Sequence, residues 1–232
     1  PAARLTHAPA LTSTSVATLT MTASSMPEPS PAQIDVIPSG PNTAGESTSP
    51  AAHTAADVPG ELTFRAATLA DVEALVALVE SAYRGDSSKQ GWTTEADMLG
   101  GRRTGADDVS ACIERADSRV LIAERDGELL GCAHIAIEDG AGYFGMFSVS
   151  PRLQGGGVGK ALLAEAERVV RDEWRLPAMH MTVIDIRDEL IAFYERRGYV
   201  RTGIKKPFPY GDERFGLPRR DDLRFEVLEK SL

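Results

Sequence analysis

The sequence has little cysteine and no long apolar run, and each absence excludes a class of protein. Only two cysteines, Cys112 and Cys132, occur in 232 residues. They cannot form a disulfide framework, and their spacing fits no metal site, so we expect two small buried thiols, a reducing compartment and no bound metal. No run of about 18 apolar residues occurs, which excludes a membrane-spanning helix and leaves no reason to expect a membrane partner.

Positive charge is also scarce. The chain has 25 Lys and Arg against 34 Asp and Glu, a formal net charge of −9. Such a balance disfavours attraction to the phosphates of nucleic acids, so no nucleic-acid partner is expected. An acidic surface fits a cationic small molecule, but most soluble proteins of this charge have no such partner.

Residues 1–60 lack Phe, Trp, Tyr and Cys and are rich in Ala, Ser, Thr and Pro. Such a stretch cannot bury enough apolar surface to offset the entropy of ordering it. We therefore predict a disordered tail over 1–60 and one domain over 61–232. The first residues faintly resemble an organelle transit peptide, but Arg4 is the one basic residue there. A plain tail or a start at Met21 or Met26 is the favoured interpretation, with a cytoplasmic location.

The apolar period and the turn residues predict the local structure of residues 61–232. Two Asp-Gly pairs, Asp126-Gly127 and Asp139-Gly140, separate apolar runs and indicate tight hairpins. Strands are predicted over 61–68, 118–125, 128–137, 141–150, 178–184 and 223–230, and helices over 69–83, 93–99 (capped by Thr93 or Thr94), 107–116, 158–174 and 187–198. Residues 84–92 read as a polar loop, and 205–222 show no clean period.

A glycine-rich segment, SPRLQGGGVGKALLAEAERVV at 150–170, follows three antiparallel strands and leads into a helix. A strand, a glycine turn and a helix start form an anion site, because the first helical N–H groups have no intrahelical partner and carry the positive end of the dipole. A P-loop is excluded by Gln154 and Ala161, and a dinucleotide fingerprint by Lys160. The residues alone therefore predict a phosphate at the helix start without identifying the compound.

The spacing of Gln154, Gly157 and Gly159 is Gln-x-x-Gly-x-Gly. Within FSVSPRLQGGGVGKALL it resembles the acetyl-CoA-binding motif of the GNAT superfamily of N-acetyltransferases. ELIAFYERRGY, with Tyr194, resembles a later motif of that superfamily, in the family's order and spacing. The resemblance covers residues 61–232. It implies an α+β fold with a central, mostly antiparallel mixed sheet, splayed strands and flanking helices.

The resemblance also implies where acetyl-CoA, the co-substrate, would bind. The pyrophosphate would lie on the backbone N–H groups of the glycine loop, whose members are Gln154, Gly155, Gly156, Gly157, Val158, Gly159 and Lys160. The pantetheine arm would lie between the strand ending at Val149 and the strand ending near Asp185. Phe147, Ser148 and Val149 would offer backbone groups, one of which would polarise the thioester carbonyl.

Two side chains near the later motif carry further expectations. Tyr194 matches the family's tyrosine that protonates the departing thiolate as a general acid. A core aromatic, or a residue that only holds the sulfur, is the alternative. Arg187 stands where many members carry an asparagine that contacts the pantetheine arm, so it either reaches the cofactor's phosphates or faces solvent.

The general base and the acceptor site are less defined. Asp185 is the first candidate base, followed by Glu95 and Asp97, although each is more simply a surface or capping carboxylate. The acceptor site is expected over 83–103 and 205–220, and its substrate-wall candidates are the loop aromatics Trp92, Phe208, Tyr210 and Phe215. Anchoring of a long loop explains these aromatics equally well.

The predicted function is therefore transfer of an acetyl group from acetyl-CoA to a primary amine of a small molecule or peptide, by direct attack in a ternary complex. The protein would be a monomer or homodimer. A non-catalytic acyl-CoA-binding or sensing module on the same fold is the alternative, because it would share the same motifs.

Overall fold

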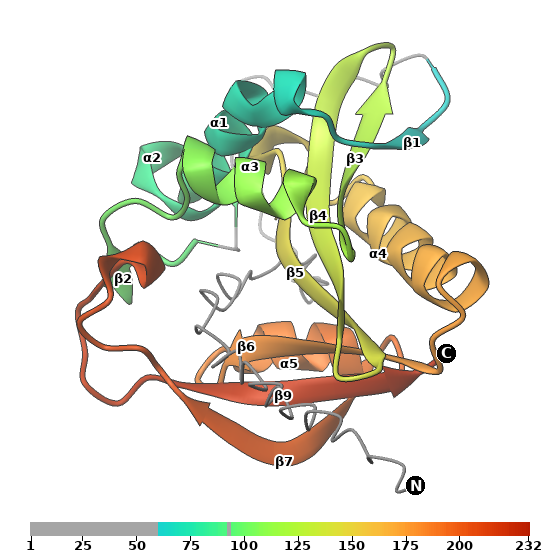
Figure 1. Ribbon diagram of the computed structural model, residues 1–232. Coiled ribbons are helices and arrows are strands. Elements are labelled where there is room, and N and C mark those ends of the chain that lie inside the picture. The colour runs from blue at the N-terminus through green and yellow to red at the C-terminus, as the bar shows by residue number, and fades with distance from the viewer. Residues whose placement is uncertain (1–59, 92–93) are drawn as a thin grey trace, which may run out of the picture.

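The computed structural model describes residues 60–91 and 94–232 (Figure 1). The predicted tail, apart from Gly60, lies outside these residues. The strands are β1 (Thr63–Ala66), β2 (Leu99–Gly100), β3 (Ser118–Arg125), β4 (Glu128–Glu138), β5 (Ala141–Val149), β6 (Ala178–Ile184), β7 (Val200–Pro207), β8 (Leu217–Pro218) and β9 (Arg224–Ser231). The helices are α1 (Val72–Tyr83), α2 (Gly85–Ser88), α3 (Ala106–Glu114), α4 (Val158–Arg168) and α5 (Asp188–Glu195).

Seven of the strands form one mixed sheet in the order β1-β3-β4-β5-β6-β9-β7, and β2 pairs with β8 in a separate ribbon. Every neighbouring pair in the large sheet is antiparallel except β5 and β6, which are parallel. Asp126-Gly127 and Asp139-Gly140 both have positive φ at each residue, as the tight hairpins between β3, β4 and β5 require. The predicted fold class and meander are thus confirmed.

Helices cover both faces of the sheet, because successive apolar side chains of β3 point to opposite faces and each face needs a cover. Val120 and Ile122 pack with α1 and α3, whereas Leu121 and Ala123 pack with α4. The cluster that contains Leu121, Ala123 and residues of α4 also includes residues of α5, β5 and β6. Fully burying one such leucine or isoleucine contributes about 1.5–3 kcal/mol, so these two clusters hold the layers together.

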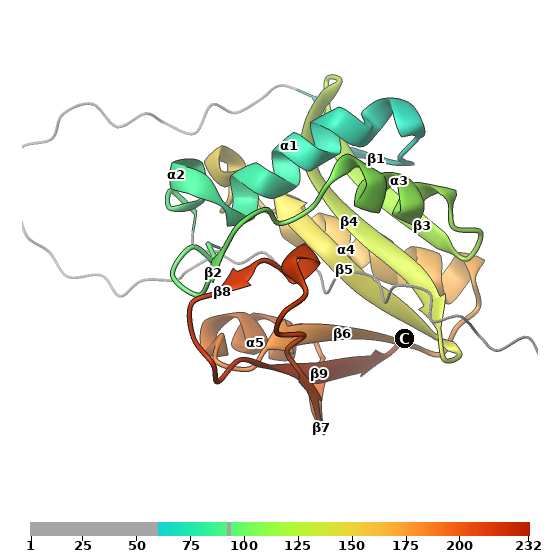
Figure 2. The ribbon, with the colours of Figure 1, turned by 60° about the vertical axis from the view of Figure 1, so that its left-hand side comes forward.

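The parallel strands β5 and β6 meet only at their starts. Gly142 pairs with Met179 and Tyr143 with His180, and beyond these two pairs the ladder ends. Figure 2 shows β6 and β9 diverging from β3–β5. Just past the paired region, Met146 has a φ of +46° and the β4–β5 register shifts between Cys132 and His134. Such a bulge bends a strand and raises its twist, so it accounts for the splay that the resemblance implies.

Three local predictions were wrong. The helix expected at 93–99 is a single turn over its described part: Met98 and Leu99 both donate to the Glu95 carbonyl before Leu99 enters β2. Ion pairs hold the Glu95 side chain in the interior, and they outweigh the helix propensity of this segment. The loop expected at 84–92 contains the short helix α2. The strand β7 was not predicted, because every residue of this edge strand is exposed and no apolar alternation marks it.

The two cysteines are free; Cys132 is buried, as expected, whereas Cys112 is only half-buried. No helix among the described residues has both the length and the apolar character needed to cross a membrane.

Candidate active site

The glycine loop leads from β5 into α4 and presents open backbone. Gly155 and Gly157 have φ of +95° and +83°, a conformation that L side chains rarely adopt, and Gly157 is the residue before the first turn of α4. A Cβ at either position would meet no heavy atom within 4 Å. The space in front of these glycines can therefore admit a phosphate close to the first N–H groups of α4, and the loop fits a pyrophosphate.

Gln154 connects this loop to two neighbouring segments. Its Nε2 donates to the Val149 carbonyl at 3.4 Å. Its amide group also packs against Gly91, where a Cβ would collide with it. The segment after α2 thus closes onto the glycine loop.

The backbone at the splay is held by Tyr83, which lies at the end of α1. The Tyr83 hydroxyl donates to the Phe147 carbonyl at 2.5 Å, and both residues are fully buried. Ser148 and Val149 follow, also buried. This bond fixes the strand just after the bulge, which is where the resemblance expects the pantetheine arm and the thioester to be contacted.

Tyr194 lies on α5 and is fully buried. It belongs to the same apolar cluster as Phe147 of β5 and Met181 of β6, so residues of both splayed strands share its surroundings. Its ring packs edge-on against Phe193 and Tyr199, with centroids 5.1 and 5.6 Å away. This position is compatible with proton donation to a sulfur in the splay.

Glu95 is not the surface carboxylate that the sequence suggested. It has no exposed area, and its two oxygens meet Arg84 at 2.7 Å, Arg187 at 3.3 Å and Arg103 at 3.9 Å. Burial raises the pKa of the Glu95 carboxyl, but the three guanidinium groups outweigh burial and lower it. A carboxylate held below its usual pKa by buried cations is a poor general base, so this geometry argues for a structural role.

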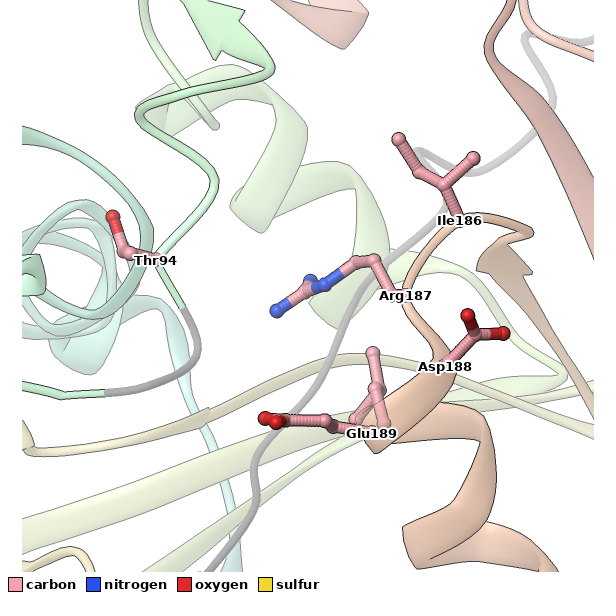
Figure 3. Close-up of a pocket in the computed structure, with 6 residues that line it drawn as sticks. Thr94, Ile186, Arg187, Asp188 and Glu189 are labelled. Atoms are coloured by element: carbon pink, nitrogen blue, oxygen red, sulfur yellow. The ribbon is translucent and has the colours of Figure 1, made fainter.

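Arg187 precedes α5 and does not face solvent, which was one of the two placements expected for it. Its side chain is 7% exposed and its Nη1 lies 3.3 Å from Glu95 Oε1. It also lines a hollow of about 360 Å³ at the start of α5, opposite Thr94 (Figure 3).

Asp185 follows β6 and is engaged in ion pairs on one oxygen. Asp185 Oδ2 lies 2.9 Å from Lys205 Nζ and 3.3 Å from an Nη of Arg224. Its neighbour Ile184 packs with Leu99 of β2, so alternation directs Asp185 to the other side of the sheet. This placement is unfavourable for a base that must reach an acceptor near β2. Asp97 is exposed.

The two segments expected to form the acceptor site do come together. The ribbon β2·β8 joins them (Figure 2), and Leu99 of β2 belongs to a small apolar cluster that includes Phe208. Phe208 is 5% exposed in that cluster, with Phe215 packed against it, so both anchor the loop rather than line an open wall. Tyr210 is 44% exposed, and its hydroxyl accepts from the Leu223 N–H at 2.7 Å. Trp92 lies outside the described residues.

Sequence reasoning missed Arg84 and Arg103 as members of the Glu95 cluster. Arg84 was read as part of a polar loop, and Arg103 as the end of the acceptor segment 83–103. Both are less than 10% exposed. An arginine in such surroundings carries no local signal, because its carboxylate partner lies 11 or 8 positions away and the intervening turn must fold first. Among the described residues, no cluster of three or more His, Cys, Asp or Glu could hold a metal ion.

The chain is similar to known acetyltransferases. Residues 79–199 match the Acetyltransferase (GNAT) family. An IAA acetyltransferase from Azospirillum brasilense is 32% identical over 111 residues, which cover 45% of this chain and 68% of that protein. Two solved structures share the fold: ribosomal-protein-alanine N-acetyltransferase from Brucella melitensis (TM-score 0.54, 22% identity, 73% and 99% coverage) and IAA acetyltransferase from Bacillus cereus (TM-score 0.53, 13% identity, 74% and 100% coverage).

Proposed function

Because the chain belongs to the GNAT family of acetyltransferases, we propose that it transfers the acetyl group of acetyl-CoA to a primary amine. The observation that carries this proposal is the splay between β5 and β6, with the open glycine loop after β5 and buried Tyr194 in the apolar cluster that both strands share. The GNAT family uses acetyl-CoA in general. The named acceptors of the similar proteins differ, so they do not identify the acceptor here.

The glycine loop binds the pyrophosphate through its backbone N–H groups and the start of α4. Gly155 and Gly157 admit the phosphate because no side chain occupies the space in front of them. The backbone of Phe147, Ser148 and Val149, fixed by Tyr83, positions the thioester. A backbone N–H aimed at the carbonyl oxygen stabilises the negative charge that develops there.

Acetyl-CoA supplies an activated acetyl group. The amine nitrogen forms a bond to the acetyl carbon while the carbon–sulfur bond breaks, and the sulfur leaves as a thiolate. The amine gives up one proton to water or a base, and the Tyr194 hydroxyl gives one to the thiolate. Tyrosine carries its proton at neutral pH, since its ordinary pKa is about 10. Direct transfer needs no covalent enzyme intermediate.

The test is acetyl-CoA binding followed by turnover. Calorimetry should show that acetyl-CoA binds. A free-thiol assay with a panel of small primary amines, and of peptides with a free N-terminal amine, should then show release of the coenzyme A thiol. Binding without release on any amine would instead identify an acyl-CoA-binding or sensing module. No binding at all would overturn the proposal.

A further inference from the structure

Tyr83 connects the end of α1 to β5 beyond the point where β5 separates from β6. The last residues that pair the two strands are Tyr143 and His180, and the Tyr83 hydroxyl donates to the Phe147 carbonyl at 2.5 Å, four positions further along β5. The Tyr83 ring is fully buried in the apolar cluster that contains Met146. A side chain from a helix therefore holds the backbone of β5 in the part that β6 no longer pairs with.

The pairing of β5 with β4 shows which backbone groups of β5 face the splay. The Ser150 N–H donates to the Leu130 carbonyl of β4, and a trans peptide directs its N–H and its carbonyl oppositely, so the Val149 carbonyl points away from β4. In an antiparallel ladder every second residue faces the same neighbour, so Ser148 also faces β4. By the same peptide geometry, the Phe147 carbonyl and the Val149 N–H point away from β4. We call the edge formed by the backbone of residues 147–149 the open β5 edge.

Two side chains donate to the carbonyls of the open β5 edge. The Tyr83 hydroxyl bonds to the Phe147 carbonyl, and Gln154 Nε2 bonds to the Val149 carbonyl at 3.4 Å. In a complete sheet, N–H groups of β6 would hold these carbonyls. The two side chains therefore supply bonds that the separation of β6 removes. With its carbonyls engaged in this way, the edge presents the Val149 N–H to the splay, and an N–H suits a carbonyl of a ligand.

Tyr83 is itself held at its ring and at its backbone. The Arg103 guanidinium lies over the ring, with its central carbon 5.2 Å from the ring centroid. The Tyr83 carbonyl accepts from the Glu95 N–H at 3.3 Å and from Arg84 Nη1 at 3.3 Å. The group of buried ion pairs around Glu95 thus fixes the tyrosine that fixes β5. The hydroxyl is in place before any ligand binds, which is what preorganisation of a site requires.

We propose that Tyr83 is a positioning residue of the acetyl transfer, which sets the rate of the chemical step by orienting the open β5 edge toward the thioester. This inference rests on the proposed function, because it adds a residue to the same reaction. Met146, with a φ of +46°, forms a bulge before the edge, and the edge has a strand partner on one side only. Without the Tyr83 hydroxyl the Phe147 carbonyl can turn, and the N–H groups of the edge turn with it. A backbone N–H stabilises the charge that develops on the thioester oxygen only while it is aimed at that oxygen.

The test changes the Tyr83 hydroxyl and keeps the ring. Tyr83→Phe removes the donor, Tyr83→para-fluorophenylalanine fills the space of the hydroxyl without a donor, and Tyr83→para-aminophenylalanine restores a donor. With saturating acetyl-CoA and the amine that the parent acetylates fastest, we expect the first two variants to lower kcat by roughly 10- to 100-fold, the size of effect that a small misplacement of reacting groups has. The amino variant should recover most of the rate. The affinity of all three variants for acetyl-CoA, measured by calorimetry, should stay within a few-fold of the parent.

Tyr199→Phe is the control, because the buried Tyr199 hydroxyl donates to Glu167 at 3.1 Å, a bond that involves neither β5 nor β6. It should lower Tm as Tyr83→Phe does and leave kcat unchanged. A kcat equal to that of the parent in the phenylalanine and fluorinated Tyr83 variants would overturn the positioning role and leave the proposed function intact. An amino variant as slow as Tyr83→Phe, or a loss of acetyl-CoA affinity at unchanged kcat, would overturn it too. If the parent releases no thiol with any amine, the proposed function fails and the positioning role fails with it.

Discussion

The carboxylate of Glu95 and the guanidinium of Arg187 form a buried ion pair between residues 92 positions apart in the chain, with Nη1 of Arg187 3.3 Å from Oε1 of Glu95. The pair joins the turn before β2 to the start of α5. Arg84 and Arg103 extend the connection to the end of α1 and the approach to α3. Four segments that surround the splay thus depend on one carboxylate.

Replacing Glu95 with glutamine should strongly destabilise the protein. Glutamine keeps the size but removes the carboxylate that three buried guanidinium groups share, and removing one partner of a buried ion pair costs about 3–5 kcal/mol. Urea unfolding at pH 7 measures this loss. The control is Glu173→Gln, since Glu173 is 38% exposed in its pairs with Arg119 and Arg168, and such pairs contribute about 0–1 kcal/mol. Similar stabilities of the two variants would contradict the role given to Glu95.

The same substitution should change the acid dependence of stability. The folded pKa of the Glu95 carboxyl is lowered, because its guanidinium neighbours outweigh the opposing effect of burial. A carboxyl with a depressed folded pKa stabilises the fold above its unfolded pKa of about 4.3, and that contribution is lost as pH falls through the folded value. The Glu95→Gln protein should therefore lose less stability than the parent between pH 5 and 3. If the two proteins lose stability equally steeply as the pH falls from 5 to 3, other carboxylates dominate the acid dependence of stability.

His134 should make stability fall in a higher pH window. Burial, followed by the charge of Arg115, lowers the pKa of the His134 imidazole from 6.5 to about 4. The Ser118 hydroxyl donates its hydrogen to the Cys112 carbonyl. His134 Nε2 lies 2.7 Å from Ser118 Oγ, so in this contact Nε2 carries the hydrogen and donates it to Ser118. The unfolded chain takes up a proton below pH 6.5 while the folded chain does not, so stability falls from pH 6.5 to about 4, by at most about 3 kcal/mol.

His134→Gln is the variant that checks this. Glutamine can still donate to Ser118 but cannot titrate, so the variant should lose less stability than the parent over pH 6.5–4.5; burial also lowers the pKa of His180, which leaves both proteins some decline. Urea unfolding at four pH values within that range is sufficient. Parallel curves for the two proteins would exclude His134 as the source of the decline.

Gly157→Val should abolish acetyl-CoA binding with little loss of fold. A valine at a φ of +83° is strained by about 1–3 kcal/mol, and its side chain would fill the open space in front of the loop. Gly127→Val is the matched control, because Gly127 has a φ of +78° and equally open surroundings but belongs to the β3–β4 hairpin, outside the glycine loop. Both variants should lose similar stability, and only Gly157→Val should lose affinity by calorimetry. Equal affinities would remove the glycine loop from the cofactor site.

Much of the fold could be predicted because its signals are local. The two Asp-Gly pairs set the hairpins of the meander, and the apolar period set α1 and α4. The edge strand β7 could not be predicted, since its side chains meet solvent on both sides and leave no pattern. The turn at Glu95 failed as a helix because long-range ion pairs, which no local rule contains, decide its conformation.

The residues of the candidate site likewise divide into those that local sequence patterns predict and those that they do not. The glycine loop and Tyr194 lie within short contiguous motifs, so the sequence alone could name both as candidate site residues. The surroundings of Arg187 could not, because its partner Glu95 belongs to a distant segment. Phe208 shows the opposite limit: an aromatic residue in an irregular stretch can be either a substrate wall or an anchor, and only its 5% exposure decides for the anchor.

Residues 1–57 should be dispensable for binding and stability. They lack Phe, Trp, Tyr and Cys, and the seven-stranded sheet is formed wholly by residues 63–231. A chain starting at Val58 should therefore keep its Tm and its acetyl-CoA affinity within error of the full chain. A clear drop in either would show that the removed residues contribute to the domain.

Tyr194→Phe should slow turnover without weakening acetyl-CoA binding. The substitution removes only the hydroxyl, so the ring contacts with Phe193 and Tyr199 survive. General acid catalysis contributes about 10²–10⁴-fold, and we expect kcat to fall by roughly that factor on the best amine while calorimetric affinity changes little. Tyr199→Phe is the matched control: Tyr199 is a buried tyrosine of the same cluster, but its hydroxyl donates to Glu167 at 3.1 Å. That variant should lose some stability and keep its turnover rate. If Tyr194→Phe turns over within a few-fold of the parent, the thiolate takes its proton from water, and Tyr194 serves to pack the splayed strands against α5.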